Sequence, residues 1–253
     1  MKKKKERVAF FTFVSDNYYY GVGTHLMANS FKKFHPDIDL VVFRQDVVDR
    51  VLKSNNVNFF NAKPTFAKLL TPYYDLIVNI DADTIILDRL DHVLKDDYEV
   101  GGAWNFNSYE NATFENITPE MYVQAGLIGS RNPKFWDIWE RENTTAYKYV
   151  RAENDVLNLV WYNDPEVSKM KRVIYDKDIP DYYGCKSLGK EGSFIVINGD
   201  VRCEGGKVFA YHHAKGGGAM PKLQFEKMGF RDDVAAYMKF CGYYGTTQHY
   251  SNI

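Results

Sequence analysis

The first third of the chain alternates short, continuous apolar runs with segments of helical periodicity, and this alternation restricts the fold more than any other feature. The apolar runs cover residues 7–14, 39–43 and 74–80. Strands buried on both faces of a parallel sheet have this composition, because neither face is left for polar side chains. Strand–helix–strand alternation predicts an α/β fold, with a mostly parallel central sheet and helices on both faces.

Three helical segments are expected between these strands. The first opens at Gly21 and is ended by Pro36, since proline cannot continue a helix. A short helix is expected at residues 47–52, and Pro64 suits the first turn of another that runs to about Leu70. In sheets of this kind, ligands bind at the carboxyl ends of the strands, near a switch in strand order.

The second half of the chain is more mixed. Strands are expected at residues 99–104, 122–129, 194–197 and 208–211, and helices at residues 133–141 and 153–162. The four tryptophans are expected in the core, where large aromatic rings contribute most: Trp104, Trp136, Trp139 and Trp161. With no repeat, low-complexity segment or linker, residues 1–253 are interpreted as a single domain.

Charge and cysteine content narrow the function classes. The formal net charge is −1, so no overall field draws the protein to nucleic acid or anionic lipid. The one run of like charge, residues 2–5, is interpreted as a solvated tail that gives at most weak membrane-surface attraction. The cysteines are odd in number and widely spaced, which indicates thiols in a reducing compartment: Cys185, Cys203 and Cys241.

The basic start of the chain differs from a signal peptide. Glu6 interrupts the basic run, and the apolar run ends at Ser15 and Asp16 with no small-residue cleavage site. No stretch approaches the roughly 20 apolar residues that a membrane span needs. We therefore expect a soluble, cytoplasmic protein without a transmembrane segment.

The strongest chemical signal is an acidic pair directly after the apolar run 74–80. Asp81 and Asp83 would both turn toward one ion at a strand end, with Ala82 between them. Carboxylates beside a buried strand are costly to leave without a partner. A hard cation such as Mg²⁺ or Mn²⁺ offsets that cost, using the carboxylates and substrate phosphates as ligands. The pair therefore predicts a metal site, with a solvated loop as the alternative.

A second polar cluster follows the apolar run 208–211. The adjacent His212 and His213 carry imidazoles, which suit Mn²⁺ in a mixed oxygen and nitrogen site. Lys215 and the three glycines that start at Gly216 would let the backbone approach a phosphate and add positive charge. The alternative is a purely structural histidine pair.

Together these residues resemble the glycogenin-like family 8 glycosyltransferases, which are retaining enzymes of the Rossmann-like GT-A fold. The resemblance covers roughly residues 7–220, and residues 73–84 are similar to the DxD strand of that family. It implies a mixed, mostly parallel sheet, with a nucleotide-binding half at about 7–100 and an acceptor-binding half at about 101–253. It also implies transfer from a nucleotide sugar, with UDP favoured over GDP, to a glycan or other hydroxyl acceptor.

The resemblance assigns roles in binding the donor. Residues 11–18 are similar to the first strand and turn of the family, where the strand end holds the uracil and an aromatic ring stacks on it. That implies nucleotide contacts from Thr12, Val14 and Tyr18. His213 with Gly216 matches the family's HxxG, whose histidine is the third metal ligand, and His212 is the alternate ligand.

Cationic side chains are also expected to bind the donor. The family has a cationic side chain ahead of its DxD strand, which corresponds to Lys63 or Lys68, and the spacing does not decide between them. Lys215 would add electrostatic stabilisation of the diphosphate leaving group.

Four residues are expected near the transferred sugar. Gln124 lies in a segment similar to the family strand that carries Asn or Gln, and Glu153, Asn154 and Asp155 lie in one similar to its DQxxLN segment. In a retaining hexosyl- or pentosyltransferase, Gln124, Glu153 and Asn154 would position the sugar. In an inverting enzyme, Asp155 or Glu153 would instead serve as the base.

Two rival functions use some of the same features. A sugar-phosphate nucleotidyltransferase also combines an α/β sheet with metal carboxylates, but needs a glycine-rich loop after the first strand, of which Gly21 and Gly23 are only a fragment. A non-catalytic carbohydrate-binding protein would suit the 16% aromatic content. Such a protein has no need for the acidic pair at a buried strand end.

Overall fold

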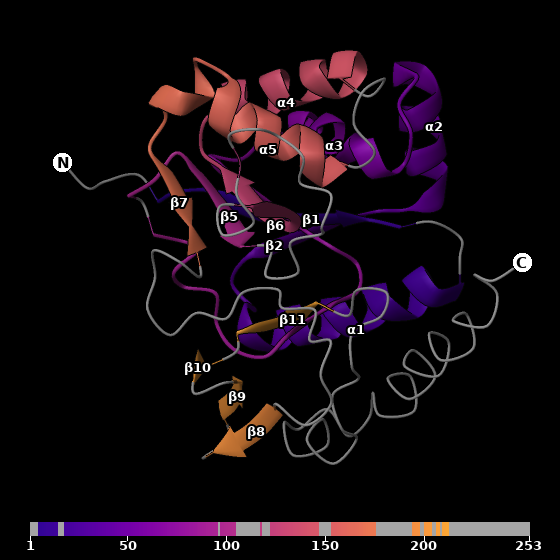
Figure 1. The fold of residues 1–253 in the computed structure, drawn as a ribbon. Helices are drawn as coiled ribbons and strands as arrows, with labels where there is room; N and C mark the ends of the chain where they lie inside the picture. The colour runs from indigo at the N-terminus through magenta and orange to yellow at the C-terminus, as the bar shows by residue number, and fades with distance from the viewer. Residues whose placement is uncertain are drawn as a thin grey trace, which may run out of the picture.

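The core of the protein is a six-stranded mixed sheet with the order β2-β1-β3-β6-β5-β7 (Figure 1). The computed structural model describes residues 5–14, 18–95, 97–104, 117, 122–146, 153–175, 194–197, 200–203, 206–207 and 209–212. The strands are β1 (Val8–Phe13), β2 (Asp39–Phe43), β3 (Leu76–Ile80), β5 (Val100–Trp104), β6 (Val123–Ser130) and β7 (Arg172–Ile174). Only β6 runs antiparallel to its neighbours, so the expected fold class is confirmed.

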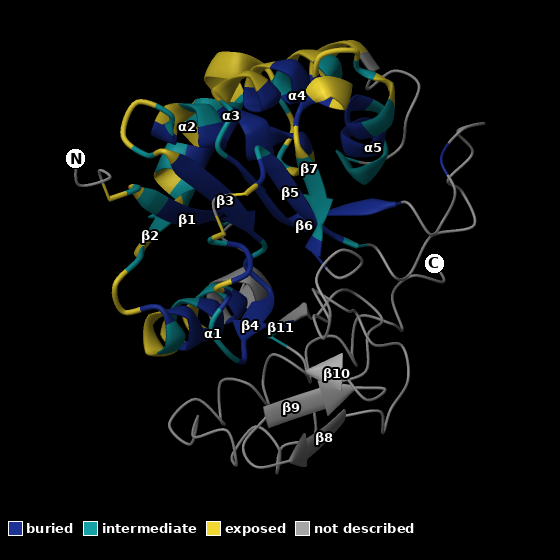
Figure 2. Ribbon diagram, turned by 90° about the vertical axis from the view of Figure 1, so that its left-hand side faces the viewer, coloured by how far each residue is buried: buried dark blue, intermediate teal, exposed yellow. Residues whose placement is uncertain are grey.

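Helices cover both faces of this sheet (Figures 1 and 2). One face carries α2 (Gln45–Asn55), η1 (Phe60–Ala62), α3 (Lys63–Leu70), α4 (Pro133–Ala146) and α5 (Glu153–Asn163). The other carries α1 (Tyr18–Phe34) and a short antiparallel pair, β4 (Thr84–Ile86) with β11 (Ala210–His212). Two hydrophobic clusters form, one on each face. The sheet is thus the middle of three layers.

Short peripheral elements complete the described part of the chain. The 3-10 helix η3 (Val167–Lys169) precedes β7. A separate three-stranded sheet has the order β10-β9-β8, with β8 (Phe194–Ile197), β9 (Asp200–Cys203) and β10 (Gly206–Lys207). No helix in the described ranges is both long enough and apolar enough to cross a bilayer.

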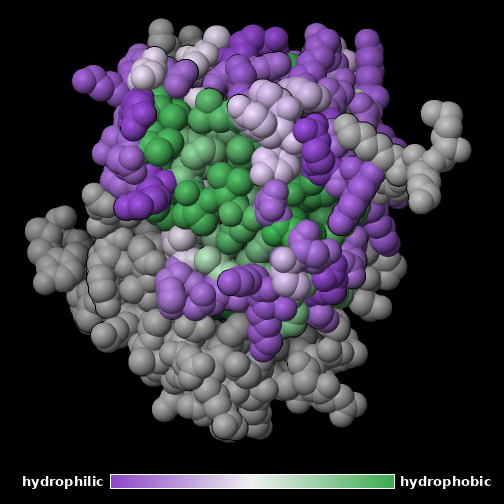
Figure 3. Space-filling view, turned by 180° about the vertical axis from the view of Figure 1, so that it is seen from behind, coloured by the Kyte–Doolittle hydropathy of each residue, from purple (hydrophilic) through white to green (hydrophobic). Residues whose placement is uncertain are grey.

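Burial explains why the inner strands were predictable. All five residues of β3 and the last five of β1 are buried, as their unbroken apolar sequences require. The edge strand β2 is only partly covered, and it lies on the side of the molecule seen in Figure 3, where apolar side chains gather across the middle. Trp136, Trp139 and Trp161 are buried as expected, and Trp104 is half-buried.

Several features differ from the sequence-based expectation, among them the strands β9 and β10, which were not anticipated. The first helix begins at Tyr18, so Gly21 and Gly23 lie inside α1 and do not form a turn ahead of it. The strand β7 was not anticipated, because three residues are too few to show a period. The expected loop at residues 216–218 lies outside the described residues.

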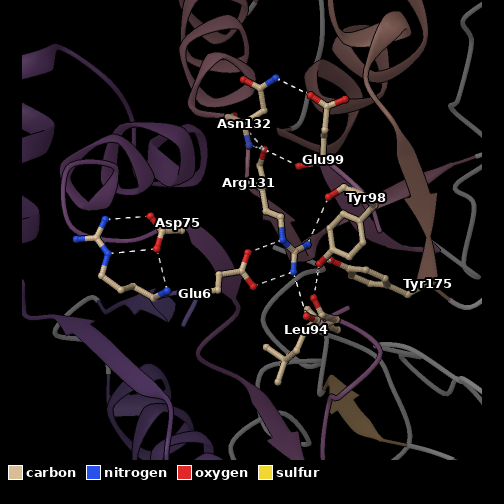
Figure 4. Close-up of polar contacts among 11 residues, drawn as sticks. Glu6, Asp75, Leu94, Tyr98, Glu99, Arg131, Asn132 and Tyr175 are labelled. Atoms are coloured by element: carbon tan, nitrogen blue, oxygen red, sulfur yellow. Dashed lines mark hydrogen bonds and ion pairs between the residues drawn. The ribbon is translucent and has the colours of Figure 1, made fainter. Parts of the chain in front are cut away.

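Arginine contacts fasten the edge of the sheet where β1 and β3 begin (Figure 4). Arg131, directly after β6, donates to both carboxylate oxygens of Glu6 at 2.6 and 3.2 Å and to the Leu94 carbonyl oxygen at 3.0 Å. Its guanidinium also lies 4.7 Å from the centre of the Tyr98 ring. Arg7 donates two side-chain hydrogen bonds to Asp75, just before β3. The candidate site lies at the opposite ends of these strands, where β1 and β3 finish.

A buried histidine makes the fold sensitive to acid. His35 is 1% exposed, and its Nε2 accepts a hydrogen bond from the Leu90 backbone N–H at 3.0 Å. Desolvation lowers its pKa from 6.5 to about 4. The unfolded chain therefore takes up a proton at a pH where the folded protein does not, so the stability is complete above pH 6.5 and falls as the pH drops toward about 4.

We predict that His35→Gln lowers the stability at about pH 7 but flattens its dependence on pH. Between about pH 7 and about pH 4.5, urea unfolding should show the wild type losing about 2–3 kcal/mol more than the variant does. His25, an exposed histidine in α1, supplies the control variant His25→Gln, which should keep the wild-type slope. Parallel pH profiles for wild type and His35→Gln would contradict this account.

Candidate active site

The acidic pair lies on a tight turn at the carboxyl end of β3. The Asp81 N–H donates to the Gly126 carbonyl oxygen at 2.9 Å, and the Thr84 N–H donates to the Asp81 carbonyl oxygen at 3.1 Å. These bonds fix the turn against Gly126, inside β6, and β4 begins directly after the turn at Thr84. Asp83 is 9% exposed. The two carboxylates thus lie at the carboxyl edge of the sheet, on the strand between β1 and β6.

A buried lysine joins this turn to α5. Lys63 Nζ lies 2.9 Å from Asp81 Oδ1 and 2.9 Å from Glu153 Oε1, and its side chain is only 5% exposed. Lys63 is the first residue of α3 and Glu153 the first of α5. Burial by itself lowers the pKa of Lys63, but the charges and hydrogen bonds of the two carboxylates outweigh burial and raise it. Lys63 therefore carries its positive charge within the cluster.

Because of this contact, the burial of Asp81 is by itself a weaker indication of a metal ion. A buried Asp81 was expected to need a metal cation as its partner, whereas Lys63 already supplies a positive charge to it. The structure also separates the two lysines that spacing could not. Lys68 pairs with Asp137 and Glu140 of α4, so its ammonium is directed away from Asp81.

A pocket opens at this edge, with charged groups on one part of its wall and aromatic rings on another. Among the described residues its lining is Thr12, Phe13, Phe59, Phe60, Lys63, Asp81, Ala82, Asp83 and Glu153. That described lining holds three carboxylates and one ammonium, so it is acidic. A cluster of this sign suits a cation and, through it, an anionic group.

The residues expected to bind the donor divide into three groups. Thr12, Lys63, Asp81, Ala82 and Asp83 line the pocket. Val14 is not part of the described lining, and its N–H donates to the Phe43 carbonyl oxygen at 3.2 Å. The remainder cannot be located by side chain: Tyr18 starts α1 with its side chain outside the described part, and Lys215 and Gly216 lie beyond the described residues altogether.

Asparagine side chains hold the segment that carries Gln124. Asn158 accepts from the Val123 N–H and donates to the Val123 carbonyl oxygen, both at 2.8 Å. Asn154 Oδ1 accepts from the Ala125 N–H at 2.8 Å. Asn79 Nδ2, from β3, donates to the Ala125 carbonyl oxygen at 2.9 Å and lies 3.4 Å from Asp81 Oδ1. The strand residues on both sides of Gln124 are therefore fixed by side chains.

These bonds distinguish the residues expected near the sugar. Asn154 directs its Oδ1 to the backbone of β6, so that atom supports the strand. Asp155 accepts a hydrogen bond from the Tyr122 hydroxyl. Glu153 is the member of the α5 group that lines the pocket. Gln124 is 9% exposed.

Strand pairing brings the backbone of His212 to the acidic turn. In the β4–β11 ladder, His212 lies opposite Thr84, the residue after Asp83. The side chain of His212 and the whole of His213 lie outside the described part. Within the described residues alone, no group of three or more His, Cys, Asp or Glu residues is arranged to hold a metal ion. The three-ligand metal site therefore stays a prediction.

The aromatic part of the pocket wall was not expected from the sequence. Phe59 and Phe60 line the pocket and were not among the expected residues. The signal that could have found them is their position: an adjacent aromatic pair stands three to four residues before Lys63, at the entrance of the helix that carries it. The bonds of Asn79 and Asn158 could not be read from spacing, because their partners are backbone atoms of distant segments.

We predict that Lys63→Met destabilises the protein by about 3 kcal/mol, because it leaves two carboxylates facing each other without their shared ammonium. Lys68→Met is the matched control: its ion pairs are with α4 at the surface and its side chain is 38% exposed. It should cost less than about 1 kcal/mol. Urea unfolding of the three proteins measures both values. Equal losses for the two variants would show that the Lys63 cluster does not stabilise the fold.

Comparison with known proteins gives structural neighbours only. No family model matches the sequence, and neither does any curated protein. One similar solved structure is the galactosyltransferase LgtC with donor and acceptor sugar analogues, at 13% identity and a TM-score of 0.49 over 93% of this chain and 95% of that one. Another is the bifunctional glycosyltransferase WbbM, at 18% identity and a TM-score of 0.49 over 92% of this chain and 49% of that one.

A third neighbour is the glycosyltransferase GlyE of Streptococcus pneumoniae, at 13% identity and a TM-score of 0.47 over 69% of this chain and 46% of that one. The chain thus spans about half the length of WbbM and of GlyE. All three neighbours are glycosyltransferases. Because the TM-scores lie below 0.5, we base the fold on strand order and pairing, and the function on the pocket.

Proposed function

We propose that this chain is a metal-dependent glycosyltransferase of the GT-A fold. It transfers a sugar from a nucleotide sugar, a UDP-sugar, to a hydroxyl group of a glycan or another acceptor, and it retains the anomeric configuration. The observation that carries the proposal is the cluster of Lys63, Asp81 and Glu153, which lines a pocket together with Asp83. The pocket lies where α/β sheets of this kind bind nucleotides, at the carboxyl ends of the strands.

The donor atoms around the acidic turn suit a hard divalent cation. Carboxylate oxygens are ligands that Mg²⁺ and Mn²⁺ accept, and an imidazole suits Mn²⁺. Held by Asp81, Asp83 and His213, with His212 as the alternate ligand, Mn²⁺ or Mg²⁺ would supply Lewis-acid stabilisation to the departing diphosphate. The pairing of β11 with β4 supports this ligand set, because it brings the histidine segment to the residue after Asp83.

The protein's own groups bind and orient the donor around that leaving group. Lys63 keeps a fixed positive charge in a nearly dry position, where it stabilises negative charge that develops on the diphosphate. Glu153 is held in place by the same ammonium and presents its carboxylate to the pocket. Gln124, on a backbone segment fixed by Asn79, Asn154 and Asn158, lies on the β6 side and positions the sugar.

The contacts of the two candidate bases favour retention over inversion. An inverting enzyme needs a carboxylate that takes a proton from the acceptor hydroxyl. Glu153 already accepts from the Lys63 ammonium, and Asp155 already accepts from the Tyr122 hydroxyl. Each carboxylate thus bonds to a protein group through one oxygen, which supports a positioning role and agrees with the retention that the family resemblance implies.

The nucleotidyltransferase alternative has less support. An enzyme of that class would use a glycine-rich loop after the first strand to surround phosphates with backbone N–H groups. Gly21 and Gly23 lie inside α1, where the backbone N–H groups of a helix interior bond within the helix. A carbohydrate-binding protein, in turn, has no need for the acidic pair Asp81 and Asp83 at the carboxyl end of a buried strand.

We predict that Asp83→Asn removes metal-dependent UDP binding and leaves the fold intact. The substitution replaces an anionic metal ligand with a neutral amide of similar size. UDP affinity in the presence of Mn²⁺ should therefore fall at least about tenfold. Isothermal titration with UDP and Mn²⁺ measures the affinity, and release of UDP from a panel of nucleotide sugars measures turnover. Circular dichroism verifies the fold.

The matched control for this experiment is Asp46→Asn. Asp46 is in the first turn of α2 and its side chain is 70% exposed, so the same chemical change is made away from the pocket. This variant should bind UDP as the wild type does. UDP binding by Asp83→Asn at the wild-type affinity would place the metal elsewhere, and failure of the wild type to release UDP from any nucleotide sugar would overturn the proposed activity.

A further inference from the structure

A second cavity lies among α2, α3 and α4, the helices that cover one face of the sheet (Figure 1). Its volume is about 370 Å³, which is within the range of small-molecule sites. Its described lining shares no residue with that of the pocket at the acidic turn. One chain segment nevertheless borders both: Asn55 and Val57 line the second cavity, and Phe59 and Phe60 line the first.

The face that α4 turns to this cavity is polar along two helical turns. Asp137, Glu140, Arg141 and Thr144 line the cavity, at the spacing that places side chains on one face of a helix. The apolar face of α4, which carries its two buried tryptophans, packs into the core instead. The cavity is therefore bordered by side chains that form hydrogen bonds, and its one apolar lining residue in the described part is Val57.

Opposite charges balance in this lining. The Lys68 ammonium lies 3.1 Å from Asp137 Oδ1 and 2.5 Å from Glu140 Oε2. Arg141 forms ion pairs with carboxylates outside the lining. The described lining thus holds two cations and two carboxylates, and each cation already has an anionic partner. A ligand ion of either sign would meet groups of its own charge and no unpaired group of the opposite charge.

A buried hydroxyl in the same lining is left without a bond. Thr65 of α3 stands one turn before Lys68 and is 5% exposed. Within the described ranges its hydroxyl has no hydrogen-bond partner. A buried hydroxyl that makes no hydrogen bond costs free energy, and a hydroxyl group of a bound ligand would supply the missing partner. Thr65 is thus an observation independent of the charged groups that also points to a hydrogen-bonding ligand.

We infer that this cavity binds a neutral saccharide, at a site separate from the proposed active pocket. A sugar hydroxyl both donates and accepts, so neighbouring hydroxyls of one ring can donate to Asp137 and Glu140 and accept from Lys68. An apolar ligand would remove water from these charged groups without replacing its hydrogen bonds. Because residues 55–60 border both cavities, a glycan bound here is held beside the active pocket.

The experiment is an NMR titration of the ¹⁵N-labelled protein without metal or nucleotide, so it does not depend on the proposed activity. The probes are the methyl glycosides of glucose, galactose, mannose and N-acetylglucosamine. At least one of them should produce saturable shifts in the amide signals of Thr65, Lys68 and Thr144. Inorganic phosphate and glycine, an anion and a zwitterion, should leave these signals unchanged.

Three variants locate the site. Thr144→Trp puts a large ring on the lining face of α4 and should abolish the glycoside-dependent shifts. Thr145→Trp is the matched control, because Thr145 is also exposed and donates to the same Arg141 carbonyl oxygen but lies outside the described lining. Thr65→Val removes the unpartnered hydroxyl at nearly constant volume. It should weaken glycoside binding about twofold to tenfold, the range for one hydrogen bond, without lowering the stability in urea.

The contrary outcomes are equally definite. If none of the four glycosides shifts the amide signals of the lining, or if phosphate or glycine shifts them, the cavity is not a saccharide site. Equal glycoside binding by Thr144→Trp and Thr145→Trp would also overturn the inference, because the sugar would then bind elsewhere. A protein that binds a glycoside here but releases UDP from no nucleotide sugar would keep the inference and lose the proposed function. The reverse result would do the opposite.

Discussion

The candidate site depends on one buried ion cluster, in which the Lys63 ammonium lies between the carboxylates of Asp81 and Glu153. Two carboxylates this close would repel each other in a dry environment, and the ammonium turns that repulsion into attraction. Since each of the three residues stands at the end of a different element, the cluster also fixes β3, α3 and α5 relative to one another. This one ion cluster thus sets both the positions of the three elements at the pocket and the charge of its wall.

The rest of the sheet is arranged so that this cluster can stay rigid. Asparagines from β3 and α5 bind the backbone of β6 at Val123 and Ala125, which compensates for the bonds that β6 lacks beyond its ladder with β3. At the opposite ends of the strands, Arg131 and Arg7 hold the segments where β1 and β3 begin. A sheet held at both edges can keep charged groups in place without bound ligand, and preorganised charge is the main source of electrostatic catalysis.

The sequence predicted what depends on local pattern. The strands β1, β2 and β3 were expected within two residues of their ends, because unbroken apolar runs between polar turns have few other interpretations. The acidic turn was placed at the end of β3 for the same reason. The start of α1 was placed too late, because Gly21 resembles a turn residue although it lies within the helix.

What could not be predicted depends on contacts between distant segments. Spacing did not decide between Lys63 and Lys68, and the choice follows only from the packing of α3 against β3 and α5. Nor did it show that Lys63 would neutralise Asp81, which weakens burial cost as an argument for metal. The approach of His212 to the acidic turn comes from a ladder between segments far apart in the chain.

The most direct test of the central claim is a crystal structure of the protein with Mn²⁺ and UDP, with data collected at the manganese absorption edge. The account predicts an anomalous peak beside Asp81 and Asp83, the diphosphate bound to the same ion, and Lys63 still hydrogen-bonded to Glu153. A peak away from that turn, or UDP bound with its phosphates remote from Asp81 and Asp83, would contradict it.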